Sequence, residues 1–413
     1  MNSVALIGDG PAALASFLVF RHAGMPAEAI TIYGDSPYPL ARLEHLASTI
    51  SQRQMRSESN GHLAPTEFPT LAVIDAWQHR TPWPLMASLF DAYVPSLNLV
   101  LAHTAKLAQH AGFAQRKVTT RIARVVRQRS PDASFALFDG AEQHVGGAQH
   151  VILALGLPGL AWPAITQGWQ DHPRVGHSYQ APVFRRDEHV VVLGSGMTAA
   201  HLWVAALTTG ARVTAIHRDP LLRQPLNVPR CSFSAAGFDA YRRLNPDERR
   251  AFHRARRGSF PWRWRWELAL WQAHRRGAFA SYQGEVVQIE AQNSHAPTGG
   301  LIMHLADGRT ISADQLVCAT GVQADARGHP LIEQLVTTYQ LPLVDGMLCA
   351  SDDFTLPSLS RPGSVCGVVG SLARWALPVA ETFYGMKYAA RSLAAILHVR
   401  QRHHQNTRNL TDR

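Results

Sequence analysis

The sequence predicts an α/β protein in which one unit, a strand, a glycine-rich turn, a helix and a second strand, occurs twice. The first copy occupies residues 4–35 and the second occupies residues 189–218. In both, an apolar run ends in Gly-x-Gly, a stretch of helical composition follows, and a β-branched run comes next. Strands and helices that alternate in this way are typical of parallel sheets covered by helices. Two copies far apart in the chain therefore predict two α/β domains.

Length and composition suit a globular protein with two medium-sized domains. The chain has 413 residues, 46% of them hydrophobic and 17% charged, which is too apolar for a disordered chain. No apolar run reaches the ~20 residues of a membrane span, and the N-terminus shows no signal-peptide pattern. We therefore expect a cytoplasmic enzyme with no membrane partner.

The formal charge of +10 would suit a nucleic-acid partner, but the rest of the sequence argues against one. Of the 40 basic residues, only Lys106, Lys117 and Lys387 are lysines, a preference for arginine that is typical of a GC-rich genome. No DNA- or RNA-binding motif accompanies the charge. We expect no nucleic-acid partner.

The four cysteines indicate neither a metal site nor a redox pair. They form no C-x-x-C motif and have no zinc-type spacing with histidines. Reduced, buried thiols in a cytosolic protein are the expected state. The residues are Cys231, Cys318, Cys349 and Cys366.

The first glycine turn has the pattern of a pyrophosphate-binding turn. Glycine lets the chain turn sharply and bring its amides close to a pyrophosphate, and the positive end of the next helix faces the same charge. A carboxylate near the end of the second strand binds the hydroxyls of an unphosphorylated ribose, and Asp35 stands there, one step after Gly34. The first copy therefore suits FAD. Its candidate binding residues are Gly8, Gly10, Pro11, Ala12, Asp35 and Arg42.

The second turn differs at the residues that set cofactor preference. Its second strand ends in His217-Arg218, with Arg223 shortly after, and basic residues at this place accept a ribose 2′-phosphate. Ala199 replaces the third glycine, a change that the motif tolerates. The second copy therefore suits NADPH. Its candidate binding residues are Gly194, Ser195, Gly196, Met197, Thr198, His217 and Arg218.

Further strands and helices are expected around the two units. Helices are predicted at 84–112, from Pro246 after an N-cap at Asn245, and at 379–399, and residues 232–280 are predicted to be a helical insertion. Strands are predicted at 118–127, 134–137, 151–156, 284–290, 301–305, 315–319 and 364–369. Asp307-Gly308 is predicted to form the turn between 301–305 and 315–319.

These features together resemble the two-dinucleotide-binding-domain flavoproteins, and among them the flavin-containing (class B) monooxygenases with their N-hydroxylating relatives. Gly8-Asp9-Gly10-Pro11-Ala12-Ala13 resembles the FAD fingerprint of that family. Ala154-Leu155-Gly156 and Ala319-Thr320-Gly321 resemble its two crossover strands, and His177-Ser178 is similar to the element that precedes its NADPH fingerprint. The resemblance adds five candidate cofactor-binding residues: Gly156, His177, Thr320, Gly321 and, where the late strand passes the FAD, Gly370.

The resemblance also implies how the domains are divided. Residues 1–157 and 316–413 would form an FAD domain in two parts. Residues 158–315 would form an NADPH domain inserted between them, with the helical insertion at about 232–280.

The activity implied by the resemblance is an NADPH-dependent monooxygenase that uses molecular oxygen. It would insert one oxygen atom into a small organic substrate, by N-, S- or C-oxygenation, through a flavin C4a-(hydro)peroxide. Met55-Arg56-Ser57 is similar to the segment that crosses near the reactive flavin edge. The candidate catalytic residues are therefore Arg56, Ser57 and Asn60, although each could equally be a helix cap or a loop residue. No metal is implied.

Other functions stay open at this point. An NADPH-dependent flavoprotein reductase that serves a quinone or a protein acceptor needs the same cofactors, and a flavoprotein fold could be kept as a binding module. A disulfide reductase is set aside, because it needs two neighbouring cysteines. The Arg/Trp-rich region 239–277 could receive an acidic carrier or acceptor protein. More often such a stretch is a helical cover with packed tryptophans and solvated arginines.

Overall fold

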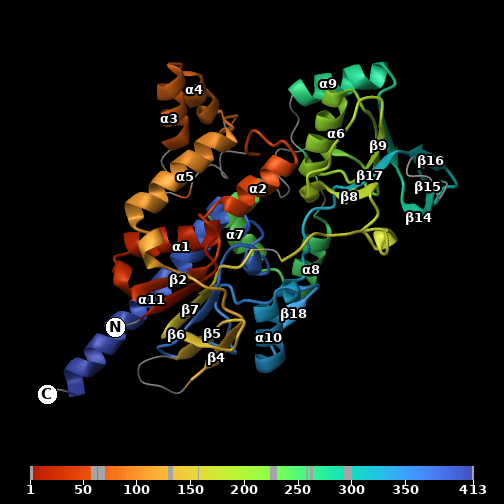
Figure 1. Ribbon diagram of the computed structural model, residues 1–413. Coiled ribbons are helices and arrows are strands. Elements are labelled where there is room, and N and C mark those ends of the chain that lie inside the picture. Colours follow the sequence, from red (N-terminus) through yellow and green to blue (C-terminus); the bar gives the residue numbers. More distant parts are fainter. Residues whose placement is uncertain are drawn as a thin grey trace.

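The chain folds into two α/β domains, each built on a five-stranded parallel sheet (Figure 1). This confirms the predicted fold class. The structure is a computed structural model that describes residues 3–56, 63, 70–90, 92–128, 134–156, 158–223, 230–256, 259–260, 264–292 and 300–411. In that part of the chain, no helix is both long and apolar enough to cross a membrane.

The first sheet takes strands from both ends of the chain, in the order β20-β7-β1-β2-β3. Its strands are β1 (Val4–Ile7), β2 (Ile30–Gly34), β3 (Lys117–Thr119), β7 (His150–Leu153) and β20 (Cys366–Val368). All four residues of β1 are buried, and β1 pairs with β2 on one side and with β7 on the other. The first glycine turn therefore follows the central strand of its sheet.

The second sheet has the order β13-β10-β9-β17-β8. Its strands are β8 (Val175–His177), β9 (His189–Leu193), β10 (Arg212–His217), β13 (Phe279–Gln283) and β17 (Gln315–Cys318). Because β17 pairs with β9 and β8, the second sheet extends to Cys318. Residue 316, where the returning segment is predicted to begin, therefore lies in a strand of the second sheet.

The two domains repeat the same topology well beyond the two predicted units. The order β7-β1-β2-β3 of the first sheet corresponds to β17-β9-β10-β13 of the second. Each domain also has an antiparallel three-stranded sheet directly before the crossover strand, β7 or β17. These strands are β4 (Arg124–Arg127), β5 (Phe135–Phe138) and β6 (His144–Ala148) in the first domain, and β14 (Val286–Ala291), β15 (Leu301–Leu305) and β16 (Thr310–Ala313) in the second.

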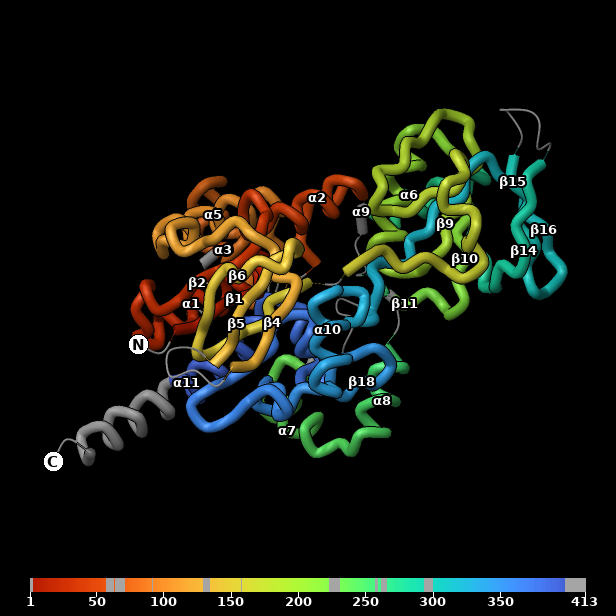
Figure 2. Tube along the Cα trace, turned by 60° about the horizontal axis from the view of Figure 1, so that its bottom comes forward, coloured from red at the N-terminus to blue at the C-terminus, as the bar shows by residue number. Residues whose placement is uncertain are grey.

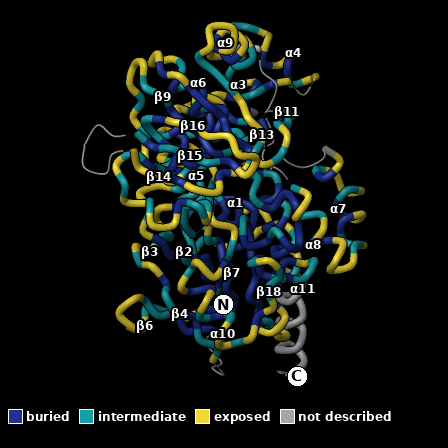
Figure 3. Tube along the Cα trace, turned by 90° about the vertical axis from the view of Figure 1, so that its right-hand side faces the viewer, coloured by how far each residue is buried: buried dark blue, intermediate teal, exposed yellow. Residues whose placement is uncertain are grey.

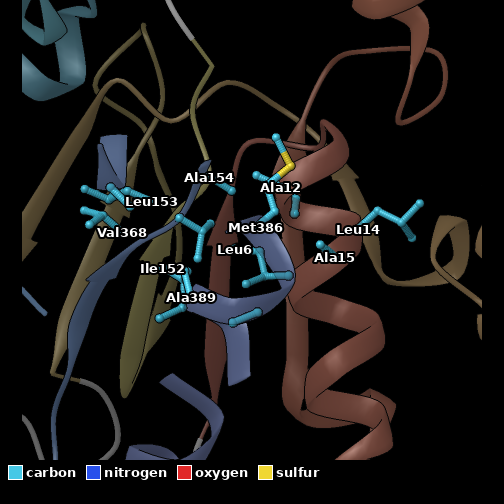
Figure 4. Packing of buried hydrophobic residues seen from close by; sticks show 14 of the residues in the cluster. Leu6, Ala12, Leu14, Ala15, Ile152, Leu153, Ala154, Val368, Met386 and Ala389 are labelled. Carbon is cyan, nitrogen blue, oxygen red and sulfur yellow. The ribbon is translucent and has the colours of Figure 1, made fainter. Parts of the chain in front are cut away.

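Helices bury their apolar sides against both sheets. In the first domain, Figure 4 shows Leu6 of β1, Ile152 of β7, Ala12 of α1 (Pro11–His22) and Met386 of α11 (Phe383–Thr411) in one apolar cluster. In the second, the fully buried Trp203 of α6 (Met197–Thr209) packs against two phenylalanines. Figure 3 shows the buried residues along the strands and α1, with exposed residues on the outer helices.

The remaining helices lie around these layers. They are α2 (Ala41–Thr49), α3 (Thr70–His79), α4 (Trp83–Leu89), α5 (Leu97–Ala111), α7 (Ala235–Arg242), α8 (Pro246–Arg254), α9 (Trp264–Arg275) and α10 (Pro330–Tyr339). The predicted start of α8 is confirmed: the Asn245 side chain accepts hydrogen bonds from the amides of Asp247 and Glu248, both at 3.0 Å.

Two predicted elements were wrong in extent, and one predicted turn was wrong in the strand that follows it. Residues 118–127 form two strands in different sheets, because the chain leaves the parallel sheet between β3 and β4. Residues 84–112 form α4 and α5, which are separated before Ser96, the N-cap of α5. The Asp307-Gly308 turn leads into the unpredicted β16 instead of directly into β17.

The predicted helical insertion does not stay with the second domain. Among its helices, α9 contacts α6 and covers the second sheet. In contrast, α7 and α8 pack on the C-terminal part of the first domain, where the Tyr241 hydroxyl donates to the Trp375 carbonyl oxygen at 2.9 Å. Figure 2 shows α7 and α8 beside the segment that carries β18 (Leu343–Val344). The insertion therefore bridges the two domains.

The two crossover segments lie side by side. Leu160 and Val322 form an antiparallel bridge, and the Ala161 amide donates to the Gly321 carbonyl oxygen at 3.0 Å. The Thr320 hydroxyl donates to the Ala161 carbonyl oxygen. The second domain is thus joined to the first through a paired double connection.

Candidate functional site

The first glycine turn lies between the carboxyl end of β1 and the N-terminus of α1. Gly8 has a φ of +105°, and a Cβ there would lie 2.6 Å from the carbonyl oxygen of Ala154. Gly10 is the N-cap of α1, and a Cβ there would meet nothing nearer than the Pro39 carbonyl oxygen at 4.0 Å. The turn is therefore packed tightly against Ala154 at Gly8, and it has open space at Gly10, next to the N-terminus of α1. This arrangement fits an anion such as a pyrophosphate.

Other predicted residues of the first site come from distant segments. Gly370 has a φ of +65°, and a Cβ there would lie 2.9 Å from the Cβ of Ala12, at the start of α1. The His329 Nε2–H donates to the carbonyl oxygen of Gly156 at 2.8 Å. Burial lowers the pKa of His329, and the nearby charges of Arg42 and Arg121 lower it further. Arg42 and Gly156 therefore lie close to the same histidine.

Two carboxylates stand near the end of β2, in different environments. Asp35, the predicted ribose ligand, is about half exposed and pairs with the Arg121 guanidinium at 2.9 Å. Asp9, inside the glycine turn, is only 6% exposed. Its Oδ2 accepts hydrogen bonds from the Ser36 amide at 2.8 Å and from the Lys117 ammonium at 2.6 Å.

The second glycine turn opens into a cleft of about 700 Å³. Gly194 has a φ of +136°, and a Cβ there would lie 2.6 Å from the carbonyl oxygen of Ala319, the same contact that Gly8 makes with Ala154. Gly196 is the N-cap of α6. The structure brings these predicted residues together in the cleft lining: Arg56, Gly194, Ser195, Gly196, Met197, Thr198, His217, Arg218, Thr320 and Gly321.

The arginines that line the cleft differ in whether they already form ion pairs or hydrogen bonds within the protein. Arg256 pairs with Glu381 at 2.7 Å, and Arg56 donates to the Ser259 carbonyl oxygen at 3.0 Å and to its hydroxyl at 2.6 Å. Arg218 is exposed at the end of β10. Asp219 also lines the cleft. Among the described arginines that line the cleft, Arg218 is therefore the best placed to meet a phosphate at this strand end.

His217 lines the cleft, but its ring is bonded within the protein. The residue is buried, its Nδ1–H donates to the Asp219 carbonyl oxygen at 2.7 Å, and its Nε2 shares a hydrogen bond with the Ser281 hydroxyl at 2.8 Å. Both ring nitrogens are therefore used. His217 therefore shapes the strand end, whereas the Arg218 side chain next to it is exposed.

His177 lies behind the cleft wall and is fully buried. Its ring centroid is 5.2 Å from that of Trp162, which does line the cleft. Burial lowers the pKa of His177, so the ring is neutral at pH 7. Next to it, the Tyr179 hydroxyl shares a hydrogen bond of 3.1 Å with the Thr198 hydroxyl on α6. His177 therefore supports the wall from behind.

The candidate catalytic residues are only partly visible. Ser57 and Asn60 lie outside the described residues. Arg56 lies at the cleft and bonds Ser259 of β12 (Ser259–Phe260), so it connects a segment of the first domain to the insertion.

Five of the described arginines of region 239–277 are paired with acids of the same chain: Arg242, Arg249, Arg250, Arg254 and Arg256. Arg249 pairs with Asp352 at 2.9 Å, and Arg254 pairs with Asp345 at 2.8 Å. Trp266 packs against His201 of α6, whereas Trp271 is exposed. These contacts match the cover interpretation better than a surface open to an acidic partner.

The cysteines and acids do not form a redox or metal centre in the described part of the chain. All four thiols are free, and burial raises the pKa of Cys318 to about 12, of Cys349 to about 11 and of Cys366 to about 12. Such thiols carry no reactive thiolate at neutral pH. Among the described residues, no group of three or more metal-ligating side chains gathers.

The sequence did not predict several residues that lie at the two sites. Asp9 carried a signal, since an acid inside Gly-x-Gly is conspicuous, but its contact with Lys117 is not local. His329 and Arg256 reach the sites from other segments. No local pattern marks either of them.

The fold and the two matching turns define the class: a two-domain α/β protein with one dinucleotide-type turn in each domain. No protein-family model and no curated protein sequence matches the chain. Solved structures do match, over nearly the full length of both chains. At 14–17% identity, these likenesses show the fold.

Three of these structures are amine hydroxylases or monooxygenases by name. The ornithine hydroxylase PvdA from Pseudomonas aeruginosa is 14% identical, with a TM-score of 0.71 over 97% of this chain and 99% of that one. KtzI, the ornithine N-hydroxylase from Kutzneria sp. 744, described with reduced FAD, NADP⁺ and L-ornithine, is 16% identical, with a TM-score of 0.74 over 97% and 100%. L-lysine 6-monooxygenase from Pseudomonas syringae is 17% identical, with a TM-score of 0.70 over 97% and 100%.

Reductases also share the fold, with lower TM-scores than these three structures. The bacillithiol disulfide reductase Bdr from Bacillus cereus is 15% identical, with a TM-score of 0.56 over 97% of this chain and 99% of that one. The fold alone therefore does not choose between oxygenation and reduction.

Proposed function

We propose that the chain is an FAD-dependent, NADPH-dependent monooxygenase that transfers one oxygen atom from O2 to a small organic substrate, with an amine nitrogen as the favoured acceptor. The observation that carries the proposal is the pair of matching turns, each with a glycine packed on the crossover strand and an open helix N-terminus. The fold of the chain is similar to that of amine hydroxylases over 97% of its length, and this similarity supports the choice of reaction.

The residues of the first turn fit a flavin dinucleotide. Open space in front of Gly10 leaves room for a pyrophosphate at the N-terminus of α1, and Gly370 brings the late strand against the same helix start. A bound FAD would supply the redox chemistry, taking a hydride from NADPH and activating oxygen. The chain's own part is to bind the cofactor, to orient it and to exclude water.

The residues of the second turn fit NADPH. Residues 194–198 line the cleft at the N-terminus of α6, where a helix attracts phosphate. Arg218 would bind the 2′-phosphate, which distinguishes NADPH from NADH. Trp162, backed by His177, gives the cleft an aromatic wall.

The cysteines argue against the disulfide reductase reaction. Three of the four thiols have raised pKa values, and none is joined to another. Arg249, Arg254 and Arg256 of the insertion are likewise already paired with acids of the same chain, which leaves these three less available to an acidic electron carrier.

The test is oxygen transfer from labelled O2. The FAD-loaded protein, NADPH and ¹⁸O2 are incubated with ornithine, lysine and other small primary amines, and products are analysed by mass spectrometry. The proposal predicts one labelled oxygen atom in the product of at least one amine. NADPH oxidation that needs a quinone or protein acceptor and never labels an organic product would overturn it in favour of a reductase.

A further inference from the structure

The end of β2 has no side chain of its own, because Gly34 is its last residue. A Cβ at Gly34 would lie 2.3 Å from the Cγ and 2.6 Å from the Oδ1 of Asp9. The Asp9 carboxylate therefore occupies the space in which a side chain of residue 34 would begin. This is the strand end at which a ribose-binding acid is expected in such a turn.

The Asp9 carboxylate is held in this place from one side. Its Oδ2 accepts from the Ser36 amide at 2.8 Å and from the Lys117 ammonium at 2.6 Å, and Lys117 also donates to the Ser36 carbonyl oxygen. Lys117 lies in register with Ile32, because β3 pairs with β2. The pair compensates the charge of a carboxylate that is almost fully buried.

The other oxygen of Asp9 differs. Among the described residues, none donates a hydrogen bond to Oδ1. Asp35, the alternative acid, has its carboxylate on the exposed Arg121 guanidinium. A carboxylate that is fixed at Oδ2 and has no donor at Oδ1 suits the hydroxyl donors of a ligand.

We propose that Asp9 is the carboxylate that binds the 2′,3′-diol of the adenosine ribose at the first turn, in place of an acid at the end of β2, and that Lys117 fixes it there. This inference rests on the proposed function, because it concerns the dinucleotide at the first site. It moves the ribose contact from Asp35 to Asp9. It also gives the first site its preference: a buried carboxylate repels a 2′-phosphate, so this turn takes FAD and rejects NADPH.

The test compares two nucleotides that differ only at the 2′-hydroxyl. ADP and 2′-deoxy-ADP are titrated against the FAD-loaded full chain, and released flavin is followed by its fluorescence. In the wild-type protein ADP should displace FAD about tenfold more effectively, because one hydrogen bond to a charged group is involved. Asp9→Asn should weaken FAD binding about tenfold or more and bring the ADP to 2′-deoxy-ADP ratio near one. The matched control, Asp35→Asn, should keep the wild-type ratio.

A second experiment moves the carboxylate from position 9 to position 34 and asks whether the preference for ADP returns. Asp9→Gly removes the side chain that fills the strand end, so Gly34→Glu in the same chain has room for a carboxylate there. The double variant should recover the preference for ADP, whereas Asp9→Gly alone should not.

The outcomes separate this inference from the proposed function. A wild-type protein that binds FAD but does not distinguish ADP from 2′-deoxy-ADP would overturn the inference alone, whatever the variants do. An Asp9→Asn protein that loses affinity for both nucleotides equally would do the same, since that pattern belongs to a purely structural residue. A wild-type protein that binds no FAD would overturn the proposed function.

Discussion

We predict that a substitution of the first glycine of each turn, Gly8 or Gly194, weakens the binding of one dinucleotide and not of the other. Gly194→Ala places a Cβ 2.6 Å from the Ala319 carbonyl oxygen, at a φ of +136° that other residues rarely adopt. Such backbone strain costs about 1–3 kcal/mol. If the turn relieves it by shifting away from the crossover strand, NADP⁺ binding should weaken by about 5- to 150-fold. Gly8→Ala should weaken FAD binding in the same range, because it meets Ala154 in the same way.

The assay measures each nucleotide separately in each variant. NADP⁺ affinity is measured by titration calorimetry on FAD-loaded protein, and FAD affinity by flavin fluorescence on the stripped protein. Gly140→Ala is the matched control, since a Cβ there meets nothing within 4 Å and its φ is not positive. Equal losses of FAD and NADP⁺ affinity in Gly194→Ala, or no loss of either, would contradict a separate nucleotide site at each turn.

Three further predictions follow from single side chains. Arg218→Ala should raise the KM for NADPH about tenfold or more and leave that for NADH nearly unchanged; equal effects on both would contradict its assignment to the 2′-phosphate. Arg249→Met should lower the free energy of unfolding by about 1–3 kcal/mol in urea titrations, because the buried Arg249 pairs with Asp352, whereas Arg250→Met should change it little. Burial, Arg256 and Arg374 lower the pKa of His253 to about 4 from its ordinary 6.5. Between about pH 6.5 and pH 4 the unfolded chain therefore binds a proton at this histidine and the folded chain does not. Because of this difference, the free energy of unfolding falls as the pH drops through this range. His253→Gln should remove about 2–3 kcal/mol of that loss between pH 7 and pH 4.5, and an unchanged pH profile would contradict the buried neutral state.

The glycine turns could be predicted because their physics is local. The sharp turn after β1 and the helix start at Pro11 depend on residues that are neighbours in the sequence, and the same holds for β9 and α6. The extent of the internal repeat was harder to predict. The strands β4–β6 and β14–β16 are short, and only their pairing shows that the two domains repeat the same order.

The chemistry at the strand ends could not be predicted, because it depends on contacts between distant residues. The position of His217 marks the end of β10, but Ser281, which bonds its ring, comes 64 residues later. Asp35 stands at the predicted place, yet Arg121 pairs with it at the surface. The partner of Asp9 is Lys117, which reaches it only because β3 pairs with β2.

The helical insertion shows a second limit of the sequence. Its amphipathic pattern predicts that α7 and α8 cover an apolar surface, but it does not say which one. Phe238 of α7 packs against Tyr388 of α11, with ring centroids 4.5 Å apart. The insertion therefore contacts the first domain as well as the second, and this could only be found in three dimensions.

The proposed function requires that the two turns bind FAD and NADPH in one chain. The most direct measurement is the visible spectrum of the purified protein after incubation with FAD and removal of free flavin, followed by anaerobic addition of NADPH and, separately, NADH. We expect one bound FAD per chain, and we expect NADPH to bleach it much faster than NADH does. A protein that takes up no FAD, or whose bound flavin NADPH does not reduce, would contradict it.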